Sequence, residues 1–391
     1  MSAPAGDGVV REALALRAWA LRLLGGEPAP PPRAGEAAWQ AFLFAERCAM
    51  PLRVRMAMQV SGAETVGVLE ARATIELQRA MAARAGLAEL ARMVREHGLR
   101  AMVLKGGVPL AQGGEMLDVS DVDLLLSAEH AAALAAAMDR SGWSPEYADP
   151  VPGTPGCFHL AGRTRPGYVG VELHYALAFL GGDFDPWEGA RPSAIPGLLR
   201  MAPRAQAWHV LAHAVVHHPA RRGTLRDLLV LAQALRECTA DDLAALEARA
   251  AASVHAAPLG DALAMARALA GGRAPDDAFA AVAAIVYLLV SGASRVPHDG
   301  RFGGALVAAA TGFVAGGGEY RRLWAGGPTA VLTPEAFQGG YGIDRWAPGA
   351  ARALRKLQRG SVLAAASVPG WMLARRAARL TGRAEQAAAR N

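Results

Sequence analysis

Apolar residues recur at helical spacing over most of this chain and at strand spacing only in its middle part. The spacing predicts helices over residues 9–24 and 69–96, with a turn in the proline-rich stretch 27–33 between them. Beyond position 200 strand patterns nearly vanish, and predicted helices cover residues 206–216, 225–237, 240–252, 259–270 and 278–290. We therefore expect a helical region over residues 1–98 and a helical domain over residues 201–350.

The middle segment, residues 99–200, is predicted to form a small mixed sheet with helices. Short apolar runs predict strands at residues 100–104 and 121–126, followed by a helix at Ala128–Arg140 with Ser127 as its N-cap. Two more runs, 157–160 and 168–173, predict a strand pair joined by a turn. The predicted fold class is α+β: a small mixed β-sheet core flanked by N-terminal helices and a large C-terminal helical region.

Composition excludes several protein classes. With 52% hydrophobic and 19% charged residues among 391, the chain can bury a sizeable core and is not disordered. Its three cysteines are widely spaced, which excludes a disulfide scaffold and a cysteine-based zinc finger and fits a reducing compartment. The first residues lack the pattern of a secretory signal, and the longest uncharged stretches are too short to span a bilayer. We expect a cytoplasmic protein.

Basic residues gather in a tail at residues 351–391, which holds nine of them and a single acid, Glu385. The tail thus accounts for the net charge of +6, and the rest of the chain lacks the charge of a nucleic-acid binder. Helices are predicted near 351–359 and 370–380. The apolar stretch 360–374 contains Trp371 between arginines, a pattern typical of a solvated face, of a segment lying peripherally on an anionic membrane, or of a docking site for a partner.

The candidate chemistry begins with two acids at the start of a predicted strand. Asp121 and Asp123 alternate with apolar residues, so their carboxylates project from one face. Two carboxylates a few ångström apart repel each other, and a divalent cation commonly offsets that cost. Ligation by oxygen alone suits Mg²⁺ or Mn²⁺, which also bind nucleotide phosphates.

A glycine pair precedes the acids and a third acid follows them. Gly106 and Gly107 allow the backbone to approach a triphosphate with free N–H donors, and the predicted helix that follows would add positive potential. Lys105, one of only two lysines against 39 arginines, would neutralise more phosphate charge. If the strand at 168–173 lies beside the Asp121 strand, Glu172 completes a three-acid cluster, with His174 positioned to orient that acid or to pack.

Together these motifs resemble the DNA polymerase β-like nucleotidyltransferase superfamily, and within it the bacterial family of uncharacterised nucleotidyltransferases. The resemblance spans roughly residues 36–240. It rests on Leu104-Lys105-Gly106-Gly107, Ser120-Asp121-Val122-Asp123-Leu124-Leu125, Val171-Glu172-Leu173-His174-Tyr175, and the histidine-rich stretch 208–218 with Arg226-Asp227 after it.

The resemblance implies a nucleotidyltransferase core at residues 99–200, an enzyme that uses NTP as substrate, and a metal cofactor, Mg²⁺ or Mn²⁺. It carries catalysis and metal ligation over to Asp121, Asp123 and Glu172. Nucleotide binding is carried over to Lys105, Gly106, Gly107 and Ser120. Family members often have an arginine shortly before the acid pair, but residues 116–119 here are Met-Leu-Asp-Val. The triphosphate grip is thus left to Lys105 or to an arginine distant in sequence.

Two functions follow as alternatives. The first is metal-dependent transfer of an NMP group from an NTP to a hydroxyl, with release of pyrophosphate; the acceptor, whether RNA, protein, peptide or small molecule, is not identified. The second is a catalytically silent scaffold that keeps the fold and is anchored by its basic tail.

The histidines at 209, 213 and 217 follow one another at intervals of four, on one face of a predicted helix. Such spacing suits zinc for two of them, which leaves a metallohydrolase as a third alternative. Neutral histidines lining an interface or the nucleotide pocket are favoured instead, with His213 and Asp227 as supporting residues around the site.

Overall fold

The computed structural model describes residues 6–60, 66–114, 117–147, 149, 158–177, 180, 184–217, 222–253, 255–291, 310 and 369–382. The chain divides into two compact units, each assembled from separated stretches. The sheet unit comprises Arg47–His213 and Leu225–Arg273. The helical unit comprises Met1–Glu46, Ala214–Thr224 and Ala274–Asn391.

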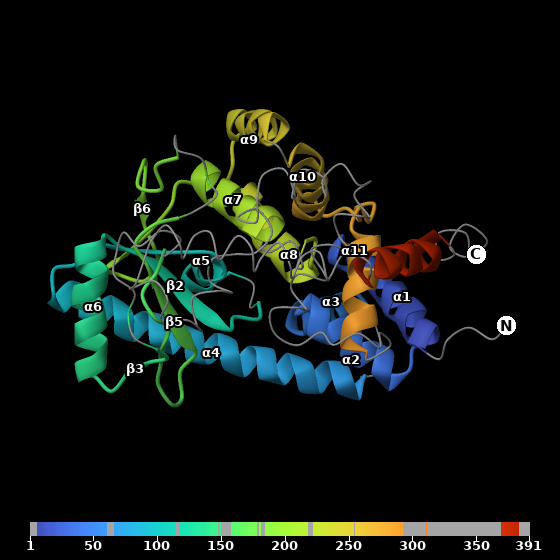
Figure 1. Ribbon diagram of the computed structural model, residues 1–391, viewed down its shortest axis with the longest axis horizontal. Coiled ribbons are helices and arrows are strands. Elements are labelled where there is room, and N and C mark those ends of the chain that lie inside the picture. The colour runs from blue at the N-terminus through green and yellow to red at the C-terminus, as the bar shows by residue number, and fades with distance from the viewer. Residues whose placement is uncertain are drawn as a thin grey trace. The chain divides into compact units, whose positions relative to one another are not determined.

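A seven-stranded mixed sheet organises the sheet unit, in the order β3-β4-β5-β2-β1-β7-β6 (Figure 1). β2 pairs parallel with β5, and β1 pairs parallel with β7, whereas the other neighbours are antiparallel. The strands are β1 (Ala101–Val103), β2 (Asp121–Leu125), β3 (Ser144–Pro145), β4 (Arg163–Thr164), β5 (Gly170–His174), β6 (Arg191–Pro192) and β7 (Leu198–Arg200).

The two faces of the sheet have different partners. On one face, Val122 and Leu124 of β2 and Val171 and Leu173 of β5 pack against α4 (Gly67–Glu96) and α6 (Ala128–Arg140) in one buried core. Figure 1 shows α4 running beneath β2 and β5. Because strand side chains alternate, the residues between these apolar ones project from the opposite face. That face carries the candidate chemistry.

Shorter helices complete the sheet unit. α3 (Ala49–Gln59) packs on α4, and α5 (Gly107–Ala111) follows β1 directly. Four helices come after the sheet: α7 (Pro203–Ala212), α8 (Leu225–Arg236), α9 (Ala240–Ala252) and α10 (Ala256–Ala270). Between α7 and α8 the chain forms a π-helical turn, η1 (His213–His217), which belongs to the helical unit from Ala214 onward.

The α+β prediction is confirmed, and several elements match closely. The helix at Ala128–Arg140 has the predicted bounds, and the Ser127 side chain accepts a hydrogen bond from the His130 N–H. The described part of the strand predicted at 157–160 does pair antiparallel with β5, but only as a short bridge between His159 and His174. The Leu160 N–H donates to the Leu173 carbonyl, and the Tyr175 N–H donates to the Phe158 carbonyl. β5 also pairs with β4, where the buried Arg163 is held by the Asp149 carboxylate. β6 and β7 are too short for their residues to show a period.

The helical unit contains α1 (Gly6–Leu24), α2 (Glu36–Glu46), α11 (Ala280–Val290) and a helix at residues 369–382. A buried polar network joins its separated stretches. Arg17 donates to Glu46 Oε1 at 2.7 Å, to Asp277 Oδ2 at 2.7 Å and to the Gly223 carbonyl at 2.7 Å. The Tyr287 hydroxyl donates to the same Glu46 oxygen at 2.5 Å. Charges this deeply buried require such complete pairing.

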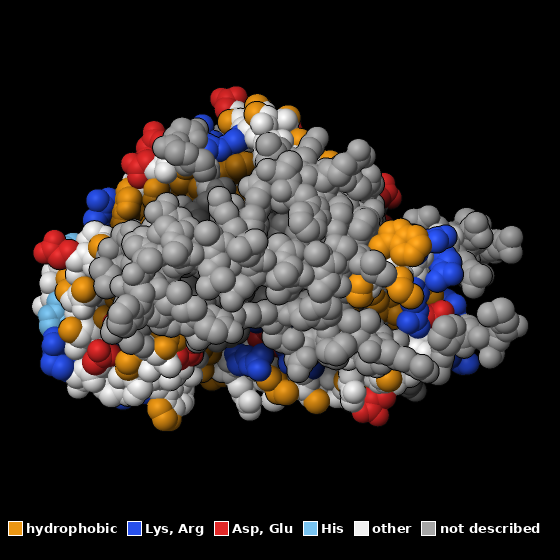
Figure 2. All heavy atoms as spheres, in the orientation of Figure 1, with side chains coloured by type: hydrophobic (Ala, Val, Ile, Leu, Met, Phe, Trp, Pro, Cys, Tyr) orange, Lys and Arg blue, Asp and Glu red, His pale blue; other side chains and the backbone are white. Residues whose placement is uncertain are grey.

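Much of the basic tail lies outside the described residues, as does the predicted helix at 351–359. Its described helix, 369–382, has Trp371 45% and Met372 60% exposed, with the Arg375 guanidinium 4.9 Å from the Trp371 ring centroid. Figure 2 shows this apolar patch beside basic side chains. Arg376 donates to Asp7 of α1, which ties the helix to its own unit. Within the described ranges, no helix combines the length and hydrophobicity needed to cross a membrane.

Candidate active site

Two paired strands bring the predicted acids together. The parallel register of β2 and β5 sets Asp121 opposite Gly170 and Asp123 opposite Glu172. Strand alternation places Asp121, Asp123, Glu172 and His174 on the face away from α4 and α6. The prediction that the Glu172 strand lies beside the Asp121 strand is therefore confirmed.

Asp123 is the centre of the cluster. Its carboxylate oxygen Oδ1 lies 2.7 Å from the Lys105 ammonium and 2.9 Å from His174 Nε2. His174 Nε2 is also 3.3 Å from Glu172 Oε2, so the imidazole contacts both carboxylates. The Asp123 side chain is 5% exposed, whereas that of Glu172 is 33% exposed and faces solvent in part.

This cluster has the donor set of a metal site. One ligand atom each from Asp123, Glu172 and His174 lies within 4.8 Å of the others. The two carboxylate oxygens suit Mg²⁺ or Mn²⁺, whereas an imidazole nitrogen is a more usual ligand of Zn²⁺ or Fe²⁺. The prediction placed Asp121 in this set, whereas the compact group contains His174 instead. Lys105 holds one oxygen of Asp123, so a cation at this carboxylate uses the other oxygen or displaces the ammonium.

The pKa values of these residues are shifted because several charged groups are buried close together. Burial alone would raise the pKa of Asp123, but the charge of Lys105 and the hydrogen bond from His174 hold it well below its usual value. Burial raises the pKa of Asp121, and the Asp123 charge raises it further, against the hydrogen bond from the Ser120 hydroxyl. Burial would lower the pKa of Lys105, but the charges of Asp123 and Glu172 raise it above normal. The site thus favours the ionised form of Asp123, whereas its burial and the neighbouring charge make Asp121 easier to protonate.

The glycine pair has a more structural role than predicted. A Cβ at Gly107 would lie 2.8 Å from Val103 Cγ2, so glycine permits close packing on β1. The Gly107 N–H donates to the Leu104 carbonyl at 3.0 Å and is not free for a phosphate. Helix α5 has only five residues, so its dipole is small and adds little positive potential. Lys105 adopts a left-handed φ of 46°, which costs a non-glycine residue about 1 kcal/mol.

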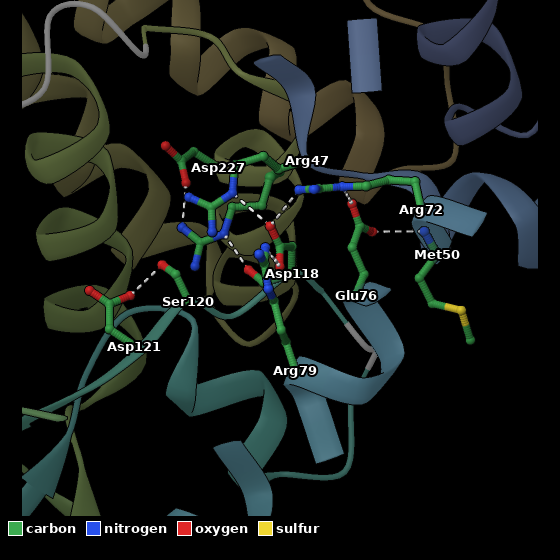
Figure 3. Close-up of polar contacts among 10 residues, drawn as sticks. Arg47, Met50, Arg72, Glu76, Arg79, Asp118, Ser120, Asp121 and Asp227 are labelled. Carbon is green, nitrogen blue, oxygen red and sulfur yellow. Dashed lines mark hydrogen bonds and ion pairs between the residues drawn. The ribbon is translucent and has the colours of Figure 1, made fainter. Parts of the chain in front are cut away.

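Beside the acids lies an arginine cluster, of which the sequence motifs had included only Arg226 (Figure 3). We use this name for Arg47, Arg72, Arg79 and Arg226, which surround Asp118. The Asp118 carboxylate is fully buried and accepts from Arg47 at 2.7 Å, Arg72 at 3.2 Å and Arg79 at 3.4 Å. These charges hold the pKa of Asp118 below its usual value, although burial acts to raise it.

Arg226, at the start of α8, links this cluster to the glycine pair. Its Nε donates to the Asp118 carbonyl at 3.1 Å and its Nη1 to Asp227 at 2.7 Å. A Cβ at Gly106 would lie 2.5 Å from Arg226 Nη2, so the guanidinium lies directly over this glycine. The Asp121 charge also contributes to the raised pKa of Arg226. Residues 116–119 contain no arginine, and helices distant in sequence supply the positive charge here instead.

One feature of the sequence could have predicted part of the arginine cluster. Arg72, Glu76 and Arg79 fall at helical spacing on the face of α4 that also carries the buried Ala73 and Ala80. Charged residues on an otherwise apolar helix face indicate buried partners. Glu76 accepts from Arg72 at 3.3 Å and from the Met50 N–H at 2.9 Å, and this pairing permits its burial.

The histidine-rich helix is not continuous. α7 ends at Ala212 and a π-helical turn, His213–His217, replaces the predicted α-helical spacing. The rings of His209 and His213 pack edge to face with centroids 6.2 Å apart. Among the described residues, neither belongs to the group that can hold a metal. Asp227, predicted beside them, pairs with Arg226.

Comparison with known proteins gives one match. A family model described as uncharacterised nucleotidyltransferase matches residues 55–271, more than half of the chain. That range includes β2, β5, α5 and α8, and thus the glycine pair, the acids and Arg226. Neither the curated proteins nor the solved structures gave a match.

Proposed function

Since the chain belongs to the uncharacterised nucleotidyltransferase family, we propose that it uses a polymerase β-like core to transfer an NMP group from an NTP to a hydroxyl acceptor. The observation that carries this proposal is the register of β2 and β5, which sets Asp123 opposite Glu172 with Asp121 nearby. Carboxylates gathered on one sheet face beside a cationic cluster suit a reaction that moves phosphoryl groups.

The residues present fit a divalent cation. Asp123 and Glu172, with His174 or Asp121 beside them, would hold it. When bound, such an ion neutralises phosphate charge and lowers the pKa of an acceptor hydroxyl. Because Glu172 is the more exposed of the paired acids, its carboxylate is the group placed to take the hydroxyl proton. The acceptor oxygen then forms a bond to the α-phosphorus, the α–β bridging bond breaks, and pyrophosphate leaves.

The arginine cluster supplies the triphosphate grip. Guanidinium groups bind phosphate oxygens in pairs, and Arg226 lies over Gly106 while Arg79 is 43% exposed. Lys105, predicted for this role, bonds to Asp123 instead. Of the arginines that pair with Asp118, Arg79 makes the longest contact, at 3.4 Å, and is the most exposed, so its guanidinium is the one most open to an anion.

The test of this function uses the full-length protein with each of the four common NTPs and Mg²⁺ or Mn²⁺. Release of pyrophosphate and transfer of α-labelled nucleotide, to the protein or to co-purifying material, are measured. We expect both, and we expect EDTA to stop them. Absence of pyrophosphate release with every NTP and either ion would contradict the proposal.

Replacing Arg79 by alanine is expected to weaken NTP binding by roughly tenfold or more, because a charge-assisted hydrogen bond contributes about 1.5–3 kcal/mol. AMP, which lacks the β- and γ-phosphates, should bind equally to both proteins. Arg84→Ala is the matched control, since Arg84 is exposed on the same helix. Isothermal titration with Mg²⁺ and ATP measures the difference. Equal ATP affinity in Arg79→Ala and Arg84→Ala would show that Arg79 does not bind the triphosphate.

One contact favours a second candidate function, the catalytically silent scaffold. The Lys105 ammonium lies 2.7 Å from Asp123 Oδ1 and neutralises this carboxylate, an arrangement that favours the folded state. A silent protein binds nucleotide or a partner of its basic tail but releases no pyrophosphate. Deleting residues 351–391 separates the two functions: the enzyme keeps NTP binding, whereas the scaffold loses its main interaction.

A further inference from the structure

A cavity of about 330 Å³ in the sheet unit is lined in part by α5 and α8, the helices that carry Gly107 and Arg226, and it has no role in the mechanism above. Its walls come from α3, α5, β7, α7 and α8. The volume is that of a small-molecule site. Val108 and Pro109 of α5 and Val230 and Ala234 of α8 give it apolar walls.

Side-chain amides from three helices line the cavity: Gln112 after α5, Gln206 of α7 and Gln233 of α8. Gln206 is only 5% exposed, yet its Oε1 has no hydrogen-bond partner within the part of the chain that the structure describes. The same holds for Gln112 Nε2. A buried polar atom without a partner costs about 1–3 kcal/mol. The terminal amide of glutamine turns readily, so both groups can offer their unused atoms to a molecule in the cavity.

The distance from Arg226 to the cavity is one that the ribose and base of a nucleotide can span. α5 begins at Gly107, and α8 carries Arg226 over Gly106. With a rise of 1.5 Å per residue, Val230 lies about 6 Å and Gln233 about 10 Å along α8 from Arg226. Phosphates held at Arg226 would thus leave the ribose and base of an NTP within reach of the cavity.

We propose that this cavity receives the nucleobase of the NTP and that Gln206 and Gln112 read its hydrogen-bonding edge. The inference rests on the proposed function and names the part of the substrate that selects among NTPs. A nucleobase has flat apolar faces for the Val108 and Val230 walls. Its edge presents donors and acceptors side by side, which an amide matches because it offers one of each. The enzyme accordingly prefers one base over the others.

Binding of five probes tests the inference: ATP, GTP, CTP, UTP and inorganic tripolyphosphate, each with Mg²⁺. In the wild-type protein, at least one NTP should bind about tenfold or more tightly than tripolyphosphate and than the least-favoured NTP. Gln206→Leu removes the unpaired Oε1 without emptying the volume of the side chain, so the fold should persist. It should reduce that preference about tenfold and leave tripolyphosphate binding unchanged. Gln112→Leu should act in the same direction, and Gln78→Leu, on an exposed face of α4, is the matched control.

The outcomes separate the two proposals. Wild-type protein that binds tripolyphosphate as tightly as every NTP overturns the cavity assignment and leaves the proposed function standing. Unchanged NTP affinities in both folded Gln206→Leu and Gln112→Leu overturn the assignment as well. Wild-type protein that binds none of the five probes overturns the proposed function, and the inference with it.

Discussion

Asp123→Asn abolishes pyrophosphate release in our account, by a factor of about 10³ or more, while the protein remains folded. Asp123 forms ion pairs with both Lys105 and His174, and its charge holds the cluster together. Asparagine keeps the shape and one oxygen for Lys105 but loses the negative charge that attracts a divalent ion. Pyrophosphate release from the preferred NTP is the measurement, with circular dichroism to verify the fold.

Glu172→Gln should lose activity to a similar degree, because Glu172 faces Asp123 across β2 and β5. Asp261→Asn, an exposed acid on α10, is the control and should retain full activity. A folded Asp123→Asn protein with wild-type turnover would show that the Asp123 carboxylate takes no part in the reaction.

Asp118→Asn should lower the free energy of unfolding of the protein by about 3–5 kcal/mol. The carboxylate is fully buried and accepts from three arginines, so its loss leaves their charges facing one another without compensation. Urea unfolding measures the effect. Glu70→Gln is the control: Glu70 pairs with Arg53 at the surface, where both are at least one-third exposed, and should cost about 1 kcal/mol or less.

The Asp118 contribution also depends on pH. Because the folded protein lowers the pKa of Asp118, this stabilisation is present above the unfolded value of about 3.9 and is lost as pH falls through the lower folded value. Asp118→Asn should therefore unfold with less dependence on pH below about pH 4 than the wild type. A variant as stable and as acid-sensitive as the wild type would show that the cluster does not depend on Asp118.

Long periodic elements were predictable from sequence, and short or distant ones were not. Helices such as Ala128–Arg140 and Ala240–Ala252 carry enough turns for their apolar face to be recognised, and a cap marks where each begins. The two-residue strands β4 and β6 have no period to read. β4 forms by pairing with β3 and β5, and Asp149 fixes its Arg163, contacts that are set by tertiary structure.

In the candidate site, too, features set by local sequence pattern were predictable, and features set by tertiary contacts were not. Alternation within β2 and within β5 placed the acids on one face, and their pairing brought Asp123 and Glu172 together. The partner of Lys105 could not be read from sequence, nor could the use of Gly107 for packing on Val103. The arginine cluster was hidden because its members come from the α2–α3 junction, α4 and α8, which only the fold brings to Asp118.

In the proposed mechanism, carboxylates of β2 and β5 hold a divalent cation together with an NTP. Titration of Mn²⁺, with free Mn²⁺ followed by electron paramagnetic resonance in the presence of a non-hydrolysable ATP analogue, tests it most directly. We predict that wild-type protein binds Mn²⁺ more tightly with the analogue than without it, and that Asp123→Asn combined with Glu172→Gln abolishes this binding. Equal Mn²⁺ uptake by the folded double variant and the wild type would contradict the account.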